Sequence, residues 1–215
     1  EYNLSVANST DKSSFFFSMN YLNNEGITSN SGFERLNTRL SAEIQAKPWL
    51  KVGANANYSH FNSSNINGLG DTGVGNIFYV SNVMAPIYPV YIRDGQGAIM
   101  RDENGILMYD YGEGLNAGLS RPIMGQANPI GSNVLDVDKN NGNAFNGNAS
   151  AEIRLPYGFR FTTNNAISLQ EVRYNSVTNP YYGGYADFNG MVMVEHERFF
   201  SATFQQLLNW SQSYG

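Results

Sequence analysis

The clearest pattern in the sequence is an alternation of apolar and polar residues with a period of two. It is most regular in the segment LNTRLSAEIQ, where Leu36, Leu40 and Ile44 fall on one side and Arg39 falls on the other. The segment LKVGANANYS, which follows shortly afterwards, alternates in the same way. Such strict alternation predicts β-strands with two chemically different faces.

Alternation, together with a high content of β-branched and aromatic residues, predicts seven strands. They cover residues 2–8, 14–22, 33–46, 49–61, 143–155, 158–174 and 198–213. The links between them are alternately short and long, and the longest is the loop 62–141. Because successive links of an up-and-down sheet lie at opposite ends, all short turns share one end and all long loops share the other. This arrangement favours a transmembrane β-barrel with short periplasmic turns and long external loops.

Aromatic residues near the predicted strand ends support this interpretation. The short-turn end carries Phe15, Trp49, Phe159 and Trp210, and the loop end carries Tyr21, Phe33, Tyr58, Phe145, Tyr174 and Phe199. The separation of Phe199 from Trp210 corresponds to roughly 27 Å of height in a strand tilted by about 40°. We therefore expect two aromatic girdles flanking a hydrocarbon band. A closed antiparallel barrel needs an even number of strands, so seven strands indicate a contiguous piece of a larger barrel.

The composition agrees with a strand that has lipid on one side and polar surroundings on the other. Only 14% of the residues are charged, although the hydrophobic share is 41%. A net charge of −5 without a basic run argues against nucleic-acid binding. The absence of cysteine excludes disulfides, thiolate zinc sites and a cysteine nucleophile. The chain begins with Glu1 and has no secretory signal, so we expect that preceding residues have been removed.

Several segments, in order along the chain, resemble a known family. They are FFFSMNYLNNEGI (Phe15–Ile27), RLNTRLSAEIQAKPWLKVGANANYS (Arg35–Ser59), MAPIYPVYIRDGQG (Met84–Gly97), NASAEIRLPYGFRFTTN (Asn148–Asn164) and FSATFQQLLNWSQSYG (Phe200–Gly215). They resemble consecutive barrel segments of the SusC/RagA family, which are TonB-linked outer-membrane transporters of glycan- and peptide-scavenging Gram-negative bacteria. The segment 116–141 carries no signature of this family.

The resemblance implies a 22-stranded barrel, an N-terminal plug domain, a TonB-contacting segment and a SusD-like lipoprotein that covers the barrel. We find no plug domain or TonB-contacting segment in these 215 residues, so we expect the chain to be a single segment of the barrel wall. The whole protein would import an oligosaccharide or a peptide across the outer membrane. It would contact the TonB complex through a region absent here. It would be a transporter and not an enzyme, and we assign it no cofactor.

The alternation assigns side chains to the two faces of this wall. The expected lipid-facing residues are Leu36, Leu40, Ile44, Val52, Ala54, Phe204 and Leu208. The expected lumen-facing residues, which would pair with the plug or line the substrate path, are Arg35, Arg39, Glu43, Lys51, Glu152, Arg154 and Arg160.

The loop 62–141 is the expected place of recognition, because loops of this length are commonly functional. Residues 74–85 predict a short amphipathic helix, with Asp71 or Thr72 before it and Pro86 after it. A hairpin is expected next, with Asp94-Gly95 and Asn104-Gly105 as turns.

Tyrosines in the external loops are the candidate ligand-binding residues, since a flat ring with a hydroxyl suits stacking on sugars or peptide groups. The candidates are Tyr88, Tyr91, Tyr109, Tyr111, Tyr181, Tyr182 and Tyr185. For any one of them, packing or anchoring in a girdle is the simpler interpretation.

Other polar groups predict no chemistry. DVDKNNG (136–142) lacks the glycine and glutamate spacing of a calcium loop and is read as a solvated turn. In Glu195-His196-Glu197 an extended backbone turns the histidine away from both carboxylates, so no metal is assigned. The acids Asp94, Asp102, Glu103, Asp110 and Glu113 are read as a solvated rim and not as a glycosidase pair. The alternative to the transporter is a secreted or surface β-sandwich that binds glycans without a pore.

Overall fold

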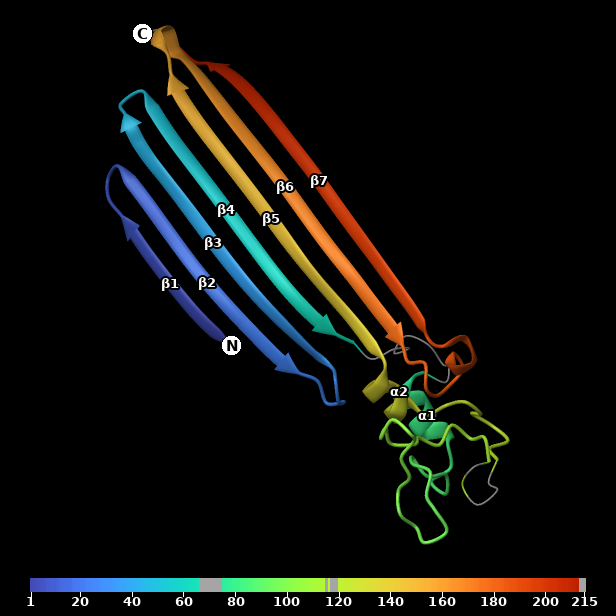
Figure 1. Cartoon of the computed structure of the whole chain (residues 1–215). Helices are drawn as coiled ribbons and strands as arrows, with labels where there is room; N and C mark the ends of the chain where they lie inside the picture. The colour runs from blue at the N-terminus through green and yellow to red at the C-terminus, as the bar shows by residue number, and fades with distance from the viewer. Residues whose placement is uncertain (66–74, 115, 117–119, 213–215) are drawn as a thin grey trace.

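The computed structural model describes residues 1–65, 75–114, 116 and 120–212. They contain one seven-stranded antiparallel sheet in which each strand pairs with its neighbours in sequence, from β1 to β7 (Figure 1). The strands are β1 (Tyr2–Ser9), β2 (Ser13–Glu25), β3 (Gly32–Lys47), β4 (Leu50–Ser64), β5 (Val137–Arg154), β6 (Phe159–Thr178) and β7 (Met191–Trp210). The helices are α1 (Ile77–Val83) and α2 (Pro129–Leu135), with single 3-10 turns η1 (Pro156–Gly158) and η2 (Ala186–Phe188). The predicted all-β fold is confirmed.

The links lie where their lengths predict. The tight turns β1–β2, β3–β4 and β5–β6 are at one end of the sheet, and both helices lie beyond the other end (Figure 1). We call these the short-turn end and the loop end.

The register of the strands gives the sheet two chemically different faces, because directly paired residues of antiparallel strands point to the same side. One row across all seven strands consists of Val6, Phe17, Leu40, Ala56, Gly147, Ile167 and Ala202. The adjacent row consists of Ser5, Ser18, Arg39, Asn57, Asn146, Ser168 and Ser201. We call the two sides the apolar face and the polar face.

The apolar face carries an uncharged band. On β7 it runs from Trp210 to Phe200, and on β4 from Val52 to Tyr58. No apolar-face residue in these stretches, or in the stretches of the other strands that pair with them, is charged. Ten residues of tilted strand cover about 25 Å of height, close to the apolar band of outer-membrane barrels.

The sheet has almost no core of its own. Of the strand residues, only Gly142 and Ser176 are buried, whereas Phe204 is 73% exposed and Phe200 63%. A β-sandwich buries one face of each sheet against a second sheet. Here the described residues form a single layer that is open on both sides, with the buried apolar side chains lying outside the sheet.

The predicted aromatic girdle at the loop end is wrong in three of its six members. Tyr21, Tyr58 and Phe145 lie on the apolar face at the edge of the band. Phe33, Tyr174 and Phe199 lie on the polar face, because each is offset by an odd number of sequence positions from the apolar-face residues of its strand. On β7 the residue at the edge of the band is Phe200. At the other end, Trp49 lies in the β3–β4 turn and outside the sheet.

Three strands, β5, β6 and β7, continue at least four residues further toward the loops than the sequence predicts. β5 begins at Val137, so DVDKNNG belongs almost entirely to a strand and is not a solvated turn. β6 continues to Thr178, and β7 begins at Met191 and not at residue 198. Around Asn141 and His196 both faces are polar, and in Met191–Val194 both faces are apolar, so the alternation disappears although the backbone pairing continues. β7 ends at Trp210, and residue 213, the predicted end, lies outside the described residues.

We expect Leu40→Arg to destabilise the intact protein in a lipid bilayer by about 2–4 kcal/mol, because it places a charge in the middle of the band. Arg39→Leu, one residue away on the polar face, should lack this depth-dependent penalty. Refolding into lipid bilayers under a denaturant gradient measures both. Equal losses for the two variants would contradict the assignment of the faces.

Candidate functional site

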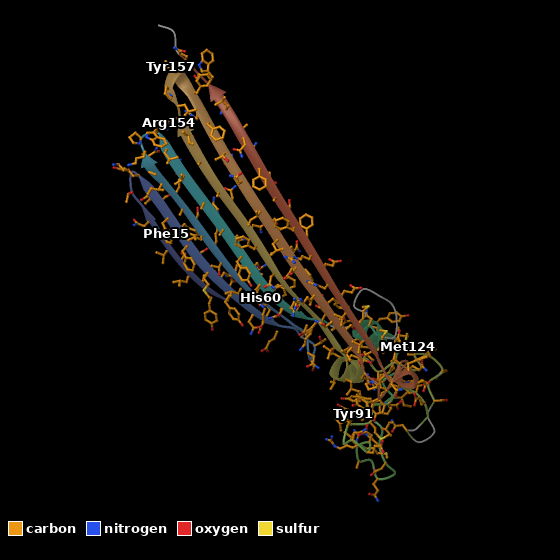
Figure 2. The ribbon with its side chains drawn as sticks, turned by 45° about the horizontal axis from the view of Figure 1, so that its top comes forward. Phe15, His60, Tyr91, Met124, Arg154 and Tyr157 are labelled. Atoms are coloured by element: carbon orange, nitrogen blue, oxygen red, sulfur yellow. The ribbon has the colours of Figure 1, made fainter. Side chains whose placement is uncertain are left out.

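The segments beyond the loop end fold into a compact unit that contains the buried apolar core of the chain. We call it the loop module; it consists of the described residues of 76–136 together with 179–190. Figure 2 shows Tyr91 and Met124 in this module and Arg154 and Tyr157 at the opposite end of the strands. Its buried apolar residues are Val80, Ile92, Tyr109, Tyr111 and Ala127.

Asparagine side chains begin both helices of the loop module. The Asn76 Oδ1 accepts the backbone N–H groups of Phe78 and Tyr79, each at 3.0 Å, so the predicted helix 74–85 spans only Ile77–Val83. The predicted capping residues Asp71 and Thr72 lie outside the described residues. Asn128 caps α2 in the same way, its Oδ1 accepting the Gly131 N–H at 3.0 Å. Asn76 and Asn128 thus satisfy backbone donors that the helices leave unpaired.

An eight-residue repeat builds the segment between the helices. RDGQGAIM is followed directly by RDENGILM, and Asp110 continues the spacing of Asp94 and Asp102. The Oδ1 of each of these aspartates accepts the backbone N–H two residues later, at 2.9, 2.9 and 2.7 Å. The sequence analysis missed this repeat, although the repeated letters could have revealed it. The positive φ of the first turn belongs to Gly97 (+88°) and not to the predicted turn glycine.

The repeat closes on itself through the backbone. The Ile92 N–H donates to the Met108 carbonyl, the Met100 N–H to the Ile92 carbonyl, and the Met108 N–H to the Met100 carbonyl, at 2.9, 2.9 and 3.0 Å. The three residues lie eight apart and bond in a cycle. The predicted single hairpin is therefore two successive turns with a common base.

Four of the seven candidate tyrosines meet in one cluster. The ring centroids of Tyr91 and Tyr109 are 5.2 Å apart, and those of Tyr109 and Tyr182 are 6.5 Å apart. Tyr182 also stacks on Tyr111 at 6.1 Å with an interplanar angle of 6°. Because Tyr109 and Tyr111 are only 4% and 3% exposed, their rings pack in the core and offer no free face to a ligand.

The other three candidates lie apart from this cluster. Tyr88 lines a hollow beside α1. Tyr181 and Tyr185 are 47% and 43% exposed on the β6–β7 loop, so their rings are accessible. Ligand stacking remains a prediction for these exposed tyrosines.

Polar contacts join the β6–β7 loop to the rest of the module. The Asp136 Oδ1 accepts the backbone N–H and the Nδ2 of Asn179, at 2.9 and 2.6 Å. The Tyr182 hydroxyl donates to the Asp102 Oδ2 at 3.0 Å. The loop between β2 and β3 is attached as well, because the Asn30 Nδ2 donates to the carbonyl of residue 133 at 2.8 Å. Hydrogen bonds therefore join the β2–β3, β4–β5 and β6–β7 connections to one another.

These contacts change the acidity of the residues that make them. Burial raises the pKa of Tyr182 to about 12, with a further contribution from its hydrogen bond to the Asp102 carboxylate. Burial also raises the pKa of Tyr111 to about 12. Burial raises the pKa of Asp102, but hydrogen bonds from the Ile106 N–H, the Tyr182 hydroxyl and the Asn104 N–H outweigh it and leave this pKa lowered.

A buried polar network lies beneath the tyrosine cluster. The Asp110 Oδ2 accepts the Asn116 Nδ2 at 2.7 Å, and the Asp110 carbonyl accepts the Arg121 Nη2 at 2.8 Å and the Asn128 Nδ2 at 3.1 Å. The Arg121 Nη1 donates to the Ala127 carbonyl at 2.6 Å. The reading of Asp110 as part of a solvated rim is therefore wrong: it is 5% exposed. Arg121, which no sequence motif marked, holds three segments together.

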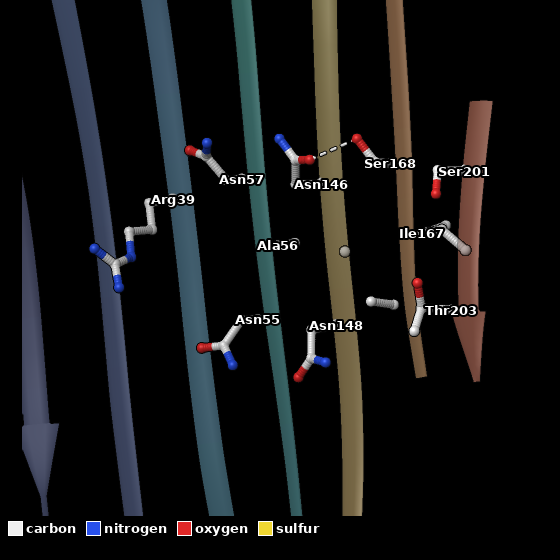
Figure 3. Close-up of a pocket in the computed structure, with 12 residues that line it drawn as sticks. Arg39, Asn55, Ala56, Asn57, Asn146, Asn148, Ile167, Ser168, Ser201 and Thr203 are labelled. Carbon is white, nitrogen blue, oxygen red and sulfur yellow. Dashed lines mark hydrogen bonds between the residues drawn. The ribbon is translucent and has the colours of Figure 1, made fainter. Parts of the chain in front are cut away.

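The polar face of the sheet is hollowed at mid-height. Asn55, Asn57, Asn146 and Asn148 project from β4 and β5 into this hollow, with Arg39 on one side (Figure 3). The Ser168 hydroxyl donates to the Asn146 Oδ1 at 2.8 Å. Amides and hydroxyls of this kind both donate and accept hydrogen bonds, which suits neutral polar ligands or peptide backbone.

All seven predicted lumen-facing residues lie on this polar face. Most of them pair with one another near the short-turn end. Lys51 contacts Glu43 at 2.9 Å, and Glu152 contacts Arg154 at 3.3 Å and Arg160 at 3.8 Å. Further up the sheet, the guanidinium groups of the other two lie over aromatic rings, with distances to the ring centroids of 5.9 Å for Arg39 over Phe16 and 6.0 Å for Arg35 over Phe33. That this face lines a lumen stays a prediction.

Two kinds of feature are absent from the described residues: a cluster of metal ligands and a membrane-spanning helix. Within the described ranges, no three His, Asp or Glu side chains are grouped as metal ligands. The same part of the chain contains no helix with the length and apolar character needed to cross a membrane.

The raised pKa of Tyr182 gives the loop module a pH dependence. Because the folded state holds the neutral phenol, this contribution to stability is complete below pH 10 and is lost as the pH rises through about 12. The difference in tyrosinate absorbance between the protein and Tyr182→Phe should therefore titrate near 12. A difference that titrates near 10 would contradict the buried position of this ring.

Gly112 and Gly97 separate two costs of adding a side chain. Both have a positive φ, +85° and +88°, so an alanine costs about 1–2 kcal/mol at either position. Only at Gly112 would the new Cβ lie 2.5 Å from the Arg121 Nε, while at Gly97 it meets open space. We expect Gly112→Ala to increase amide hydrogen exchange across 121–128, and Gly97→Ala to leave that segment protected. Similar exchange in the two variants would show that Arg121 does not organise the module.

Comparisons with known proteins match the chain to parts of larger proteins. No protein-family model matches the sequence. Over 92 residues, 43% of the chain, the sequence is 33% identical to TonB-dependent receptor P26 of Formosa agariphila, and the match covers 8% of that relative.

Solved structures of an importer contain the same arrangement of strands. A structure of the RagAB peptide transporter matches 99% of the chain with a TM-score of 0.69 and 23% identity. The RagAB peptide importer in its closed-closed state matches 99% with a TM-score of 0.67 and 22% identity. The chain spans 22% of the matched chain in each. These findings confirm the predicted resemblance to a TonB-linked transporter, over one segment of its β-barrel.

Proposed function

We propose that the chain is part of the barrel wall of a TonB-dependent importer in the outer membrane. The observation that carries this proposal is the single-layer sheet, with an uncharged apolar band on one face and amides, hydroxyls and paired charges on the other. In water such a band would be a large exposed apolar patch that promotes aggregation. In a bilayer it faces hydrocarbon, and the polar face is turned toward an aqueous interior.

The alternative, a glycan-binding β-sandwich, has less support. A sandwich needs a second sheet over the apolar face, and the described residues provide a single sheet. The relatives are a receptor and an importer and not enzymes, which favours transport over catalysis.

We infer that the whole protein imports peptides or oligosaccharides together with a SusD-like surface lipoprotein. RagAB, whose structures the chain matches, is a peptide importer, which supports a peptide as substrate. The hollow of amides on the polar face is compatible with either substrate, since sugars and peptide groups are both neutral and polar. The loop module, at the open end of the strands, is the surface on which a lipoprotein would rest. Coupling to TonB would use a region outside this chain.

Cysteine labelling tests this orientation, because these 215 residues contain no native cysteine. We place single cysteines by Gln96→Cys in the loop module and Asp11→Cys in the β1–β2 turn, in the intact protein. A membrane-impermeant maleimide should label Gln96→Cys in whole cells, and Asp11→Cys only after the outer membrane is permeabilised.

Two further positions test the faces, with the parent protein as the unlabelled control. Asn57→Cys on the polar face should react in detergent-free membranes, while Ala56→Cys on the apolar face should be shielded by lipid. Labelling of Asp11→Cys in intact cells, or equal labelling of the two neighbouring positions, would overturn the proposed function.

A further inference from the structure

Lysine and arginine are unevenly distributed over the apolar face. Among the strand residues that the structure describes, only four of them point to this face. Lys47 lies at the short-turn end, below the band. Lys139, Arg173 and Arg198 all lie above the band at the loop end, on the adjacent strands β5, β6 and β7.

The three upper cations and the neighbouring His196 form one patch, which we call the basic patch: Lys139, Arg173, His196 and Arg198. Arg173 is paired directly with His196, and Arg198 with Glu171 in the next row. Lys139 lies one row further toward the loops, in register with Asn175.

One carboxylate lies inside the basic patch. The Glu171 Oε1 is 3.7 Å from the Arg198 Nε and 3.8 Å from the His196 Nε2. Against three permanently charged cations this leaves an excess of positive charge, in a chain whose net charge is −5. The Arg198 side chain is 63% exposed, so an anion can reach it from solvent.

The acids on the apolar face do not neutralise this excess. At the loop end, Glu25 and Glu34 lie on the apolar face of β2 and β3, which β4 separates from β5–β7. Glu195 and Glu197 alternate with His196 on β7 and therefore point to the polar face. The positive surface is confined to the last three strands.

The basic patch lies directly above the apolar band. Leu169 and Phe200, paired with each other, form the upper edge of the band, and Glu171 and Arg198 occupy the next row. One such step of two residues is roughly 7 Å along the strand. This is the height at which headgroups follow acyl chains in a bilayer.

We propose that the basic patch binds the phosphate groups of phosphorylated glycolipids in the outer leaflet of the membrane. The inference rests on the proposed function, because that function places the apolar face against lipid. Arginine is the side chain best suited to phosphate, since its planar guanidinium donates two parallel hydrogen bonds. Arg173 and Arg198 on neighbouring strands provide two such groups to one headgroup, and Lys139 adds a third charge. The lipid would fix the height of β5–β7 in the bilayer.

Native mass spectrometry of the intact protein, released from lipid nanodiscs, tests this proposal. The nanodiscs contain either phosphorylated lipid A or the same lipid with its phosphates removed. We expect the protein to retain the phosphorylated lipid about 30-fold more strongly, and the double variant Arg173→Gln/Arg198→Gln to lose this preference. The matched control is Arg93→Gln/Arg101→Gln, which removes the same charge from the loop module and should retain the lipid.

Three results would overturn the proposal. The first is equal retention of the two lipids, and the second is unchanged retention by Arg173→Gln/Arg198→Gln. The third is displacement of the lipid by millimolar inorganic phosphate alone, which would indicate a site for a free anion. If neither the parent protein nor the control variant enters the nanodiscs, the proposed membrane function fails as well. Insertion without retention rejects the lipid site alone.

Discussion

Backbone hydrogen bonds between neighbouring strands hold this sheet together, because almost no side chain is buried within it. In hydrocarbon no water satisfies an unpaired N–H or C=O group, so the interior strands must be paired along their whole length. Registers that pair up to twenty residues without interruption, as between β6 and β7, meet this demand. With the backbone satisfied, the side chains need only match what each face contacts. The sheet therefore has an uncharged apolar face and a polar face and needs no core.

The loop module follows the opposite rule. It lies beyond the band, where water competes for every hydrogen bond, and it is organised like a small soluble domain. Tyr109 and Tyr111 fill its centre, and Arg121 joins separate segments by donating to their carbonyl groups. Buried arginine of this kind is costly unless its donors are used, and here both Nη atoms donate hydrogen bonds while the buried Nε has no hydrogen-bond partner among the described residues. The chain thus combines two ways of folding, one dependent on pairing and one on packing.

The sequence allowed the seven strands and the identity of their two faces to be predicted, because period two survives wherever the environments of the faces differ. It did not allow the upper parts of β5 and β7 to be predicted, since around Asn141 and His196 both faces are polar and no alternation remains. The error at Phe199 was one of parity, since a girdle needs the right face as well as the right height. The tyrosines were correctly placed in the loops beyond the strands, but no local signal distinguishes Tyr109, which is buried, from Tyr181, which is exposed. Arg121 could not be foreseen, because its partners are backbone carbonyls that are brought together only by folding.

The point at which the loop module joins the sheet has a consequence for how such proteins diversify. β4 and β5 remain paired up to Ser64 and Lys139, and the next backbone bond, from the Asn65 N–H to the Asp138 carbonyl at 2.9 Å, joins the beginning and the end of the inserted segment. The segment therefore leaves and re-enters the wall at adjacent positions, as a short hairpin would. Replacing it with an unrelated segment would require no change in strand number, register or tilt. Evolution can exchange the loop module of such a protein while the seven-stranded sheet stays the same.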